Sequence, residues 1–411
     1  MTRPDGTSRR HHNPFSLAGF ASAAVVAAMA MAGCTINSPN STAAAPALGS
    51  GSPTSAGTMA VQATDTSCGV SSATAPSGSL VFNVTNGGSK VTEFYLLAAD
   101  GLRIVGEVEN IGPGISRNLI VQAPPGAYFT VCKPGMVGDG IRAAFTVTKS
   151  GTDLTPSADD EAFVAKANSL YAAYVRDQTE QLVAVTSQFV ALYKAGKDAE
   201  ARALYPVARA HYERIEPVAE SFGDLDPKLD FRQADVEKGD RWTGWHVIEK
   251  DLWLPHGNGY TEFTSAQRTQ YAGLLVKDTA QLYQRIQTMT FSATEIANGA
   301  QGLMDEVATG KVTGEEEIWS HTDLYDFQAN TEGARIAYEG LRPLLQKTNP
   351  TLDKQIDTRF TSLQTLLDQY RVGDTGFRLY TDLSNAQIKQ LSDSVNALSE
   401  PLSKLAGAVT L

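Results

Sequence analysis

The pattern of apolar residues in the sequence changes near residue 150, and this change limits the folds that the chain can adopt. From Thr66 to Thr148, short apolar runs alternate with turn signals such as Asn86-Gly87-Gly88 and Pro124-Pro125-Gly126. Short strands at regular spacing, separated by Gly- and Pro-rich turns, are typical of a β-sandwich. We therefore predict a small all-β sandwich over residues 62–150. Its expected strands are residues 79–85, 94–97, 103–108, 118–122, 128–132 and 141–148.

Beyond Ser157 the sequence has the periodicity of helices. Gly and Pro become sparse, and apolar residues recur three and four positions apart. This spacing places the apolar residues on one face of a helix, and it predicts about eight helices joined by short loops. We therefore predict an all-α helical bundle domain over residues 157–411. One apolar stripe contains Leu170, Tyr174, Leu182, Val185, Phe189 and Leu192.

The first residues are organised as an export signal rather than as a fold. Three arginines precede an apolar run over residues 15–32, which is short for a spanning helix of about 20 residues. The run ends at Gly33-Cys34, which resembles a bacterial lipoprotein box. We predict a lipoprotein signal peptide over 1–33 and a lipidated Cys34. An ordinary secretory signal and a short membrane anchor are the alternatives.

The segment that follows the predicted signal lacks the apolar residues of a folded domain. It consists mainly of Ser, Thr, Ala, Gly and Pro. Such a composition cannot bury enough apolar surface to offset the entropy of folding. We therefore predict that residues 34–61 form a flexible tether between the lipid anchor and the folded part of the chain.

The net charge of the chain is strongly negative. The full sequence carries −11 at pH 7, and removal of residues 1–33 takes away three Arg and one Asp, which leaves −11 − 2 = −13. A chain of this charge without a basic stripe is a poor nucleic-acid binder, so no nucleic-acid partner is expected. The charge instead favours cations as ligands.

A histidine and a carboxylate lie three residues apart in the Trp-rich segment 241–253. If this segment is helical, His246 and Glu249 share one face, and a neutral imidazole beside a carboxylate can bind a first-row transition metal. Glu213 and Glu216 have the same spacing, and their like charges repel unless a cation or a base lies between them. Asp240 could add a further carboxylate.

These residues together would form an oxygen-rich site with one imidazole, which suits iron, manganese or zinc. Helical bundles build metal sites in this way, from Glu and Glu-x-x-His on facing helices. The same spacings also arise by chance, in which case His246 belongs to a packed helix and the Glu pair to a solvated face. We expect Glu315-Glu316-Glu317 to be the solvated start of a helix.

The motifs of common hydrolases are missing from the sequence. Neither His-Glu-x-x-His nor its inverse occurs, since His246-Val-Ile-Glu249-Lys250 stops one ligand short of the inverse form. Neither a Gly-x-Ser-x-Gly elbow nor a P-loop nor a dinucleotide fingerprint is present. A zinc-dependent peptidase therefore remains only an alternative to a binding protein.

Several long motifs resemble the EfeO-type proteins of the imelysin (M75 peptidase-like) family. Residues 205–217 and 242–253 carry the resemblance, and residues 298–310 and 320–327 fit it as well. The resemblance covers about residues 157–411. It implies an extracytoplasmic iron-uptake component that works with a membrane permease (EfeU-like) and a haem peroxidase (EfeB-like). It also implies that His246 and Glu249 form the family's metal motif, with Glu213 and Glu216 as carboxylate partners.

The N-terminal part resembles the cupredoxin-like domain of the same proteins. Cys68, Glu93 and Cys132 fall where that domain has Cys, Glu and Cys. The family pattern has a Met two residues before the second Cys, where this chain has Thr130, and this departure weakens the case for a metal there. Because two cysteines in an exported protein pair by default, a Cys68–Cys132 disulfide is the stronger expectation. Residues 62–150 contain no histidine, which excludes a blue-copper centre with two His ligands.

We therefore expect a non-enzymatic, lipid-anchored iron-binding protein of the extracytoplasmic space. Its cargo would be Fe²⁺ or Fe³⁺, with zinc or copper as possible competitors. The alternatives are an M75-type zinc peptidase and a cell-surface polysaccharide-binding protein. The negative charge speaks against the binding of an acidic polymer.

Overall fold

The computed structural model describes residues 58–101, 104–150, 158–236, 238–254 and 260–409. The predicted signal peptide, Cys34 and most of the predicted tether lie outside the described residues. The described residues belong to one unit, Thr54–Leu411. Among the helices described, none combines the length and the hydropathy needed to cross a membrane.

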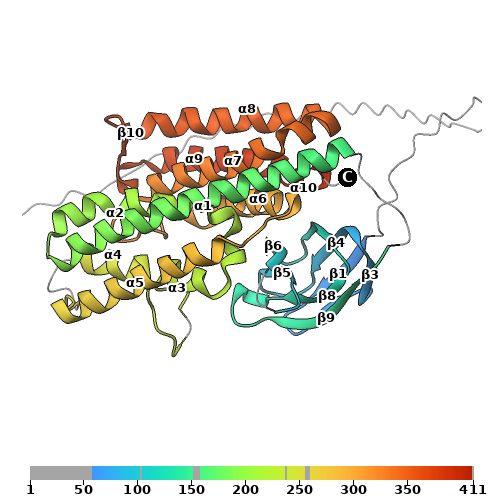
Figure 1. The fold of residues 1–411 in the computed structure, drawn as a ribbon, viewed down its shortest axis with the longest axis horizontal. Coiled ribbons are helices and arrows are strands. Elements are labelled where there is room, and N and C mark those ends of the chain that lie inside the picture. Colours follow the sequence, from blue (N-terminus) through green and yellow to red (C-terminus); the bar gives the residue numbers. More distant parts are fainter. Residues whose placement is uncertain (1–57, 102–103, 151–157, 237, 255–259, 410–411) are drawn as a thin grey trace, which may run out of the picture. The chain divides into compact units, whose positions relative to one another are not determined.

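The N-terminal part is a sandwich of two sheets (Figure 1). One sheet has the strand order β2-β1-β4-β7 and the other the order β3-β9-β8-β5-β6. The pairs β1–β4 and β3–β9 are parallel, and the remaining neighbours are antiparallel. The strands are β1 Met59–Ala63, β2 Cys68–Val70, β3 Thr74–Pro76, β4 Gly78–Asn86, β5 Thr92–Leu97, β6 Ile104–Ile111, β7 Ser116–Ala123, β8 Gly126–Cys132 and β9 Ile141–Thr148.

An apolar core lies between the two sheets. Along β4, Leu80, Phe82 and Val84 are buried while the residues between them are partly exposed, as expected for side chains that alternate across a strand. The ring of Phe82 lies 5.2 Å from that of Phe94 and 5.5 Å from that of Phe145, centroid to centroid. These contacts join the sheets and confirm the predicted all-β sandwich.

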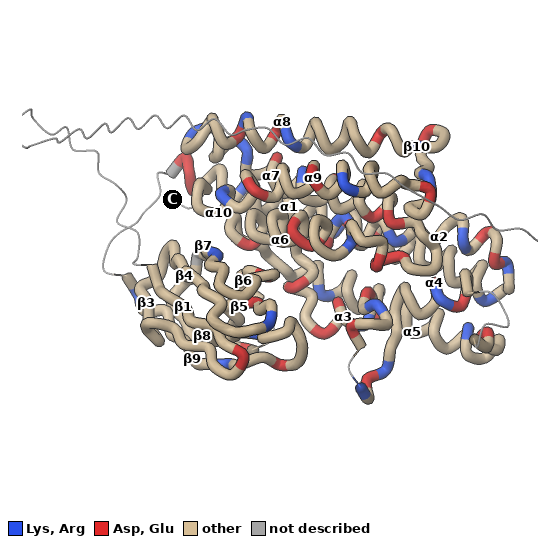
Figure 2. Tube along the Cα trace, turned by 180° about the vertical axis from the view of Figure 1, so that it is seen from behind, with Lys and Arg blue, Asp and Glu red and all other residues tan. Residues whose placement is uncertain are grey.

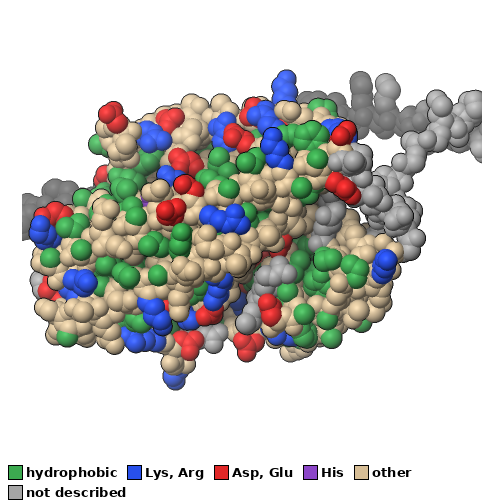
Figure 3. All heavy atoms as spheres, in the orientation of Figure 1, with side chains coloured by type: hydrophobic (Ala, Val, Ile, Leu, Met, Phe, Trp, Pro, Cys, Tyr) green, Lys and Arg blue, Asp and Glu red, His purple; other side chains and the backbone are tan. Residues whose placement is uncertain are grey.

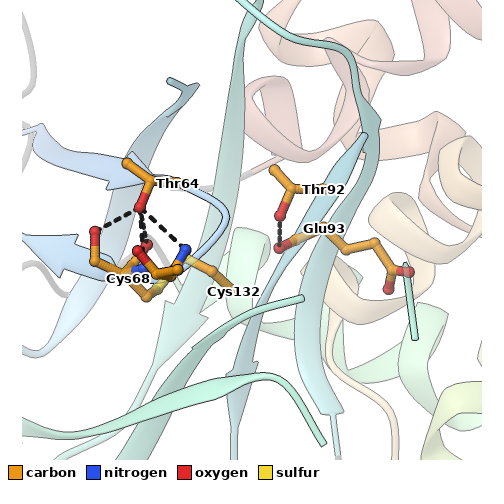
Figure 4. The surroundings of a disulfide bond; sticks show 7 residues. Thr64, Cys68, Thr92, Glu93 and Cys132 are labelled. Atoms are coloured by element: carbon orange, nitrogen blue, oxygen red, sulfur yellow. Dashed lines mark hydrogen bonds between the residues drawn. A yellow bond between two sulfur atoms is a disulfide. The ribbon is translucent and has the colours of Figure 1, made fainter. Parts of the chain in front are cut away.

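A disulfide joins Cys68 in β2 to Cys132 in β8, and therefore links the two sheets. It confirms the pairing that the sequence favoured. Sulfurs that are bonded to each other are not thiolates, so Cys68 and Cys132 are not metal ligands in this state. Figure 4 shows the Glu93 side chain pointing away from both cysteines, so the three residues do not converge.

The chain from residue 158 onward is helical, which confirms the predicted all-α domain. Helix α1 packs against α2, α5 and α7, and α7 packs against α6 and α8 (Figure 1). The helices are α1 Ala158–Lys194, α2 Asp198–Glu213, α3 Asp226–Asp230, α4 Trp245–Trp253, α5 Ser265–Ile286, α6 Ala293–Thr309, α7 Asp323–Thr348, α8 Pro350–Leu367, α9 Asn385–Leu402 and α10 Leu405–Val409. Short 3₁₀ segments include η2 Glu216–Leu225 and η3 Lys311–Thr313.

The buried face of α1 differs by one residue from the predicted stripe. Leu182 and Phe189 are fully buried as expected, but Leu170 is 56% exposed. Tyr171 and Val175 take the buried positions of the first turns instead. The helix is therefore correctly predicted, although its core-facing stripe at the N-terminal end is shifted by one position.

A glycine fixes the start of the helix that carries the predicted metal motif. Gly244 has φ 90° and ψ −156°, which a residue with a side chain rarely adopts. A Cβ at this position would overlap the carbonyl group of Leu229. The close approach of segment 228–229 allows α4 to begin at Trp245 and places His246 in its first turn.

Acidic and basic side chains are mixed over the surface. Figure 3 shows Lys and Arg interspersed with Asp and Glu on the face that it presents. Figure 2 shows the same mixture along the helices from the opposite side. Neither view shows a continuous basic stripe among the described residues.

Candidate metal centre

A buried cluster of charged side chains surrounds His246 and Arg209 in the helical domain. It is assembled from segments that lie more than 100 residues apart in the sequence, such as α2 and α7. Most of its members are within a few per cent of complete burial, which is rare for charged residues unless they are paired. The cluster contains Arg209 and Glu213 of α2, Glu216 of η2, Asp230 of α3, His246 and Glu249 of α4, Lys311 of η3, Glu316, Glu317, and Asp326 and Asn330 of α7.

The predicted His246–Glu249 pair is formed within the first turns of α4. Nδ1 of His246 lies 3.2 Å from Oε2 of Glu249. The other carboxylate oxygen, Oε1, accepts hydrogen bonds from the backbone N–H groups of Trp319 and Ser320, at 3.0 and 2.8 Å. Glu249 therefore holds the imidazole from one side and directs Nε2 toward the remaining carboxylates. This is the relation that a carboxylate has to a metal-binding histidine in many metal sites.

Two carboxylates face Nε2, the other nitrogen of this imidazole. Nε2 of His246 lies 3.6 Å from Oδ1 of Asp230 and 3.6 Å from Oε1 of Glu316. The three ligand atoms lie within 4.8 Å of one another, as do those of a second group, His246, Glu249 and Glu317. Bonds of about 2.1 Å to a metal would place neighbouring ligand atoms about 3 Å apart. Small movements of these three side chains would give that spacing, but the guanidinium of Arg209, which contacts all three ligand atoms, would also have to move.

The guanidinium of Arg209 occupies the centre of the cluster. It is fully buried, and its Nη1 lies 3.1 Å from Nε2 of His246. Burial acts to lower the pKa of Arg209, but the surrounding carboxylates outweigh it and raise this pKa well above its usual value. Arg209 is therefore a permanent buried cation. It contacts Glu213, Asp230, Glu316 at 3.0 Å, Glu317 at 2.7 Å and Asp326 at 3.6 Å.

A second buried cation lies between the two glutamates that the sequence singled out. Nζ of Lys311 is 2.9 Å from Oε2 of Glu213 and 2.7 and 2.8 Å from the two oxygens of Glu216. Nδ2 of Asn330 donates to the same two glutamates, at 3.0 and 2.6 Å. The sequence predicted that this pair needs a cation or a base between its carboxylates, and the structure places an ammonium group there.

Carboxylates outnumber cations in the cluster. Seven carboxylates contact Arg209, Lys311 or His246, and one of the seven, Glu316, also lies 3.9 Å from Nη1 of Arg232. The structure also leaves buried oxygens without a hydrogen-bond partner, namely Oδ2 of Asp323, Oδ2 of Asp326 and Oδ1 of Asn330. The described cluster is therefore short of positive charge and of donors, which is a favourable environment for a metal cation.

The pKa values in the cluster reflect this imbalance. Burial and Arg209 act to lower the pKa of His246, but the hydrogen bonds with Glu249 and Glu316 and the charge of Asp230 raise it to about 9. The raised pKa favours a proton on Nε2, whereas the 3.1 Å contact of Nε2 with Nη1 of Arg209 disfavours it, because two N–H groups cannot donate to each other. A metal that binds Nε2 must displace any proton there, because only the neutral imidazole is a ligand.

The acidic groups divide into two classes. Burial acts to raise the pKa of Glu213, but Arg209 and Lys311 outweigh it and lower this pKa below its usual value. Burial raises the pKa of Glu317 and Asp326 well above the usual range, and the neighbouring carboxylates Glu249 and Glu213 add to the effect. In the second class burial favours the neutral form, and a nearby metal cation would favour the charged form.

The predicted site residues are therefore brought together only in part. His246 and Glu249 touch each other, and Glu213 and Glu216 share Lys311, but neither glutamate belongs to the carboxylate groups found around His246 in the described chain. The two pairs are connected through Arg209. Asp240 is exposed and takes part in none of the three candidate groups among the described residues.

One sequence expectation about the cluster is wrong. Glu316 is 4% exposed and Glu317 is completely buried, so they are not part of a solvated helix start. Their segment precedes α7 and faces Arg209 and His246. Sequence reasoning also missed Asp230, since nothing in its neighbourhood marks it as a partner of His246.

A second group of carboxylates lies apart from this cluster. Glu107 and Glu109 of β6 and Glu220 of η2 place ligand atoms within 4.8 Å of one another. Burial raises the pKa of Glu109 to about 8 and that of the neighbouring Glu93 to about 7. This group contains no histidine.

Comparison with known proteins agrees with the arrangement of the helical domain. The profile of the imelysin family (Peptidase M75) matches residues 167–405, which include every member of the cluster. The proteins named "Iron uptake system component EfeO" from Escherichia coli K12, Escherichia coli O157:H7 and Shigella flexneri are each 37% identical to the chain over 354 residues. The aligned region covers 85% of this chain and 91% of each relative. The chain therefore belongs to the imelysin family.

Proposed function

We propose that this chain is a component of an iron-uptake system that captures iron outside the cytoplasm and passes it to a membrane permease. The names of its relatives support a role in iron uptake. The observation that carries the proposal is the buried excess of carboxylates around one histidine, since such a cluster gains stability when it binds a cation.

The ligand set that the geometry favours consists of Asp230, Nε2 of His246 and Glu316. Glu249 orients the imidazole through Nδ1, and Glu317 lies on the same side as Glu249. Carboxylate oxygens with one imidazole suit Fe²⁺, Fe³⁺, Mn²⁺ and Zn²⁺. Glu213, Glu216 and Asp240 remain predicted further ligands, and zinc or copper remain possible competitors of iron.

Capture is a matter of coordination and proton release. Iron must replace any proton on Nε2 of His246 and separate this nitrogen from Nη1 of Arg209. Because each lost proton is part of the binding reaction, affinity falls as the pH falls. The burial of the cluster slows exchange with solvent, so a bound cation stays with the protein until the ligands move.

The remaining parts of the proposal concern the cellular setting. A lipidated Cys34 and the tether would hold the protein at the membrane, beside an EfeU-like permease and an EfeB-like haem peroxidase. The sandwich would be cupredoxin-like in fold. Export and lipidation can be checked by mass spectrometry of the mature protein, which would start at a diacylated Cys34.

The function is tested by calorimetry of Fe²⁺ binding under anaerobic conditions. The variant His246→Ala with Glu249→Ala should lose tight binding and keep its helical content by circular dichroism. The matched control is His211→Ala, because His211 lies on α2 and its imidazole is hydrogen-bonded to Gln178, which is outside the cluster. Unchanged iron affinity in the double variant would refute the proposal. If wild type cleaves peptides in the presence of zinc and the double variant does not, a peptidase is favoured instead.

A further inference from the structure

Lys311 holds the position of a metal cation between Glu213 and Glu216. Its ammonium group meets three carboxylate oxygens at 2.7–2.9 Å and a fourth, Oε1 of Glu316, at 3.7 Å. Glu316 also faces Nε2 of His246, so one carboxylate is shared between the lysine and the favoured metal position. The Lys311 side chain is 1% exposed and makes these contacts with its charged end only.

The ammonium group and a metal ion compete for the same carboxylates. An ammonium group engages oxygen atoms through its hydrogens, whereas a metal ion binds the same lone pairs at about 2.0–2.2 Å. The two positive charges also repel each other at the short distances that Glu316 imposes. Full coordination by Glu213, Glu216 or Glu316 therefore requires Lys311 to leave.

The backbone around Lys311 differs from that around the other buried cation. Arg209 lies inside the regular helix α2 and contacts carboxylates on several sides. Lys311 begins a 3₁₀ segment of three residues that lies between Gly310 and Gly314, and Gly314 is left-handed with φ 76°. A lysine also has a flexible four-carbon stem and a compact charge, unlike the planar guanidinium. Of the two buried cations, Lys311 therefore has the more flexible side chain and the shorter supporting segment.

We propose that Lys311 is a tethered competitor of the cargo, which withdraws from Glu213, Glu216 and Glu316 when iron binds and returns when iron leaves. This inference rests on the proposed function. An uptake component must release its cargo to the next protein as well as bind it. A lysine that returns to the carboxylates replaces the lost positive charge, so release does not leave a set of unpaired buried carboxylates.

The experiment compares metal binding in wild type and in two variants of opposite expected effect. Lys311→Met removes the competitor and should bind Mn²⁺ and Fe²⁺ more tightly, by roughly tenfold or more, with slower release to a chelator; groups beside metal ligands act on this scale. Lys311→Arg keeps the charge and adds a second hydrogen-bonding edge to the carboxylates, so it should bind both metals more weakly than wild type.

The control is Lys389→Met, because Lys389 is 73% exposed and forms an ion pair with Asp393 on the surface of α9. The affinity of the Lys389→Met variant for Mn²⁺ and Fe²⁺ should equal that of wild type. If wild type binds metal and Lys311→Met binds it equally or more weakly, the competitor role is wrong and the proposed function stands. If neither wild type nor Lys311→Met binds metal, both proposals fail. If Lys311→Met does not fold, equal or tighter binding by Lys311→Arg overturns the role.

Discussion

Replacement of Arg209 by methionine is expected to destabilise the metal-free protein strongly. The guanidinium is fully buried, and methionine has a similar length without charge. Its loss leaves several buried carboxylates facing one another without their shared cation. Removal of one partner of a buried ion pair costs about 3–5 kcal/mol. The carboxylates affected are Glu213, Asp230, Glu316, Glu317 and Asp326.

This cost translates into a large change in the melting temperature. A domain of this size loses about 2–4 °C of Tm for each kcal/mol, so Arg209→Met should lower the Tm by roughly 6–20 °C. The loss should be greatest above neutral pH. At lower pH the released carboxylates bind protons and their repulsion decreases. Added Mn²⁺ should recover part of the lost stability, because it supplies the missing positive charge.

The assay is thermal unfolding followed by circular dichroism in the presence of a chelator. Arg335→Met is the matched control, since Arg335 is 36% exposed and forms a surface pair with Glu339. Such pairs contribute about 0–1 kcal/mol, so this variant should melt within a few degrees of wild type. If Arg209→Met melts at the same temperature as Arg335→Met, the view that Arg209 neutralises the cluster is wrong.

Three further predictions concern the sandwich and the histidine. Loss of the Cys68–Cys132 disulfide, which closes a loop with a sequence separation of 64, should cost about 4 kcal/mol of stability, measured by urea unfolding with and without reductant. Burial raises the pKa of Glu93 to about 7 and that of Glu109 to about 8, so the folded protein holds protons that the unfolded chain has lost above about 4.5. Stability of the metal-free protein should therefore fall as the pH rises from about 4.5 to 8, by up to about 1.4 kcal/mol per pH unit for each group, and Glu93→Gln with Glu109→Gln should flatten this slope. Glu249→Gln should weaken Mn²⁺ binding about 10–100-fold in calorimetry, because the neutral amide replaces the charged carboxylate that accepts from Nδ1 of His246 and orients the imidazole.

Periodicity predicted the sandwich strands well where apolar side chains are large. The strands around Phe82, Phe94 and Phe145 were expected, and their rings form the core. Strand β1 was missed and its first three residues were assigned to the tether, although its residues alternate in burial. Its small apolar residues in a Ser- and Thr-rich context give little signal, and its place in the sheet depends on pairing with β2 and β4. The short strands β2 and β3 were missed for the same reason.

Local spacing likewise predicted the local part of the site. His246 and Glu249 are one turn apart on α4, and a spacing rule is enough to bring their side chains together. Asp230 and Glu316 reach Nε2 because α3 packs against α4 and the segment before α7 is hydrogen-bonded to Glu249 of α4. Lys311 was missed because a single lysine after a glycine looks like any surface residue, and its burial depends on the tertiary fold.

The most direct test of the iron-binding proposal is the position of iron in crystals of the protein. Crystals grown with Fe²⁺ without oxygen, and measured on both sides of the iron absorption edge, give an anomalous difference map that shows iron alone. The proposal predicts a peak about 2.1 Å from Nε2 of His246, bonded to Asp230 and Glu316, with Lys311 displaced from Glu213. A peak elsewhere, or no peak at His246 in crystals that contain iron, would contradict it.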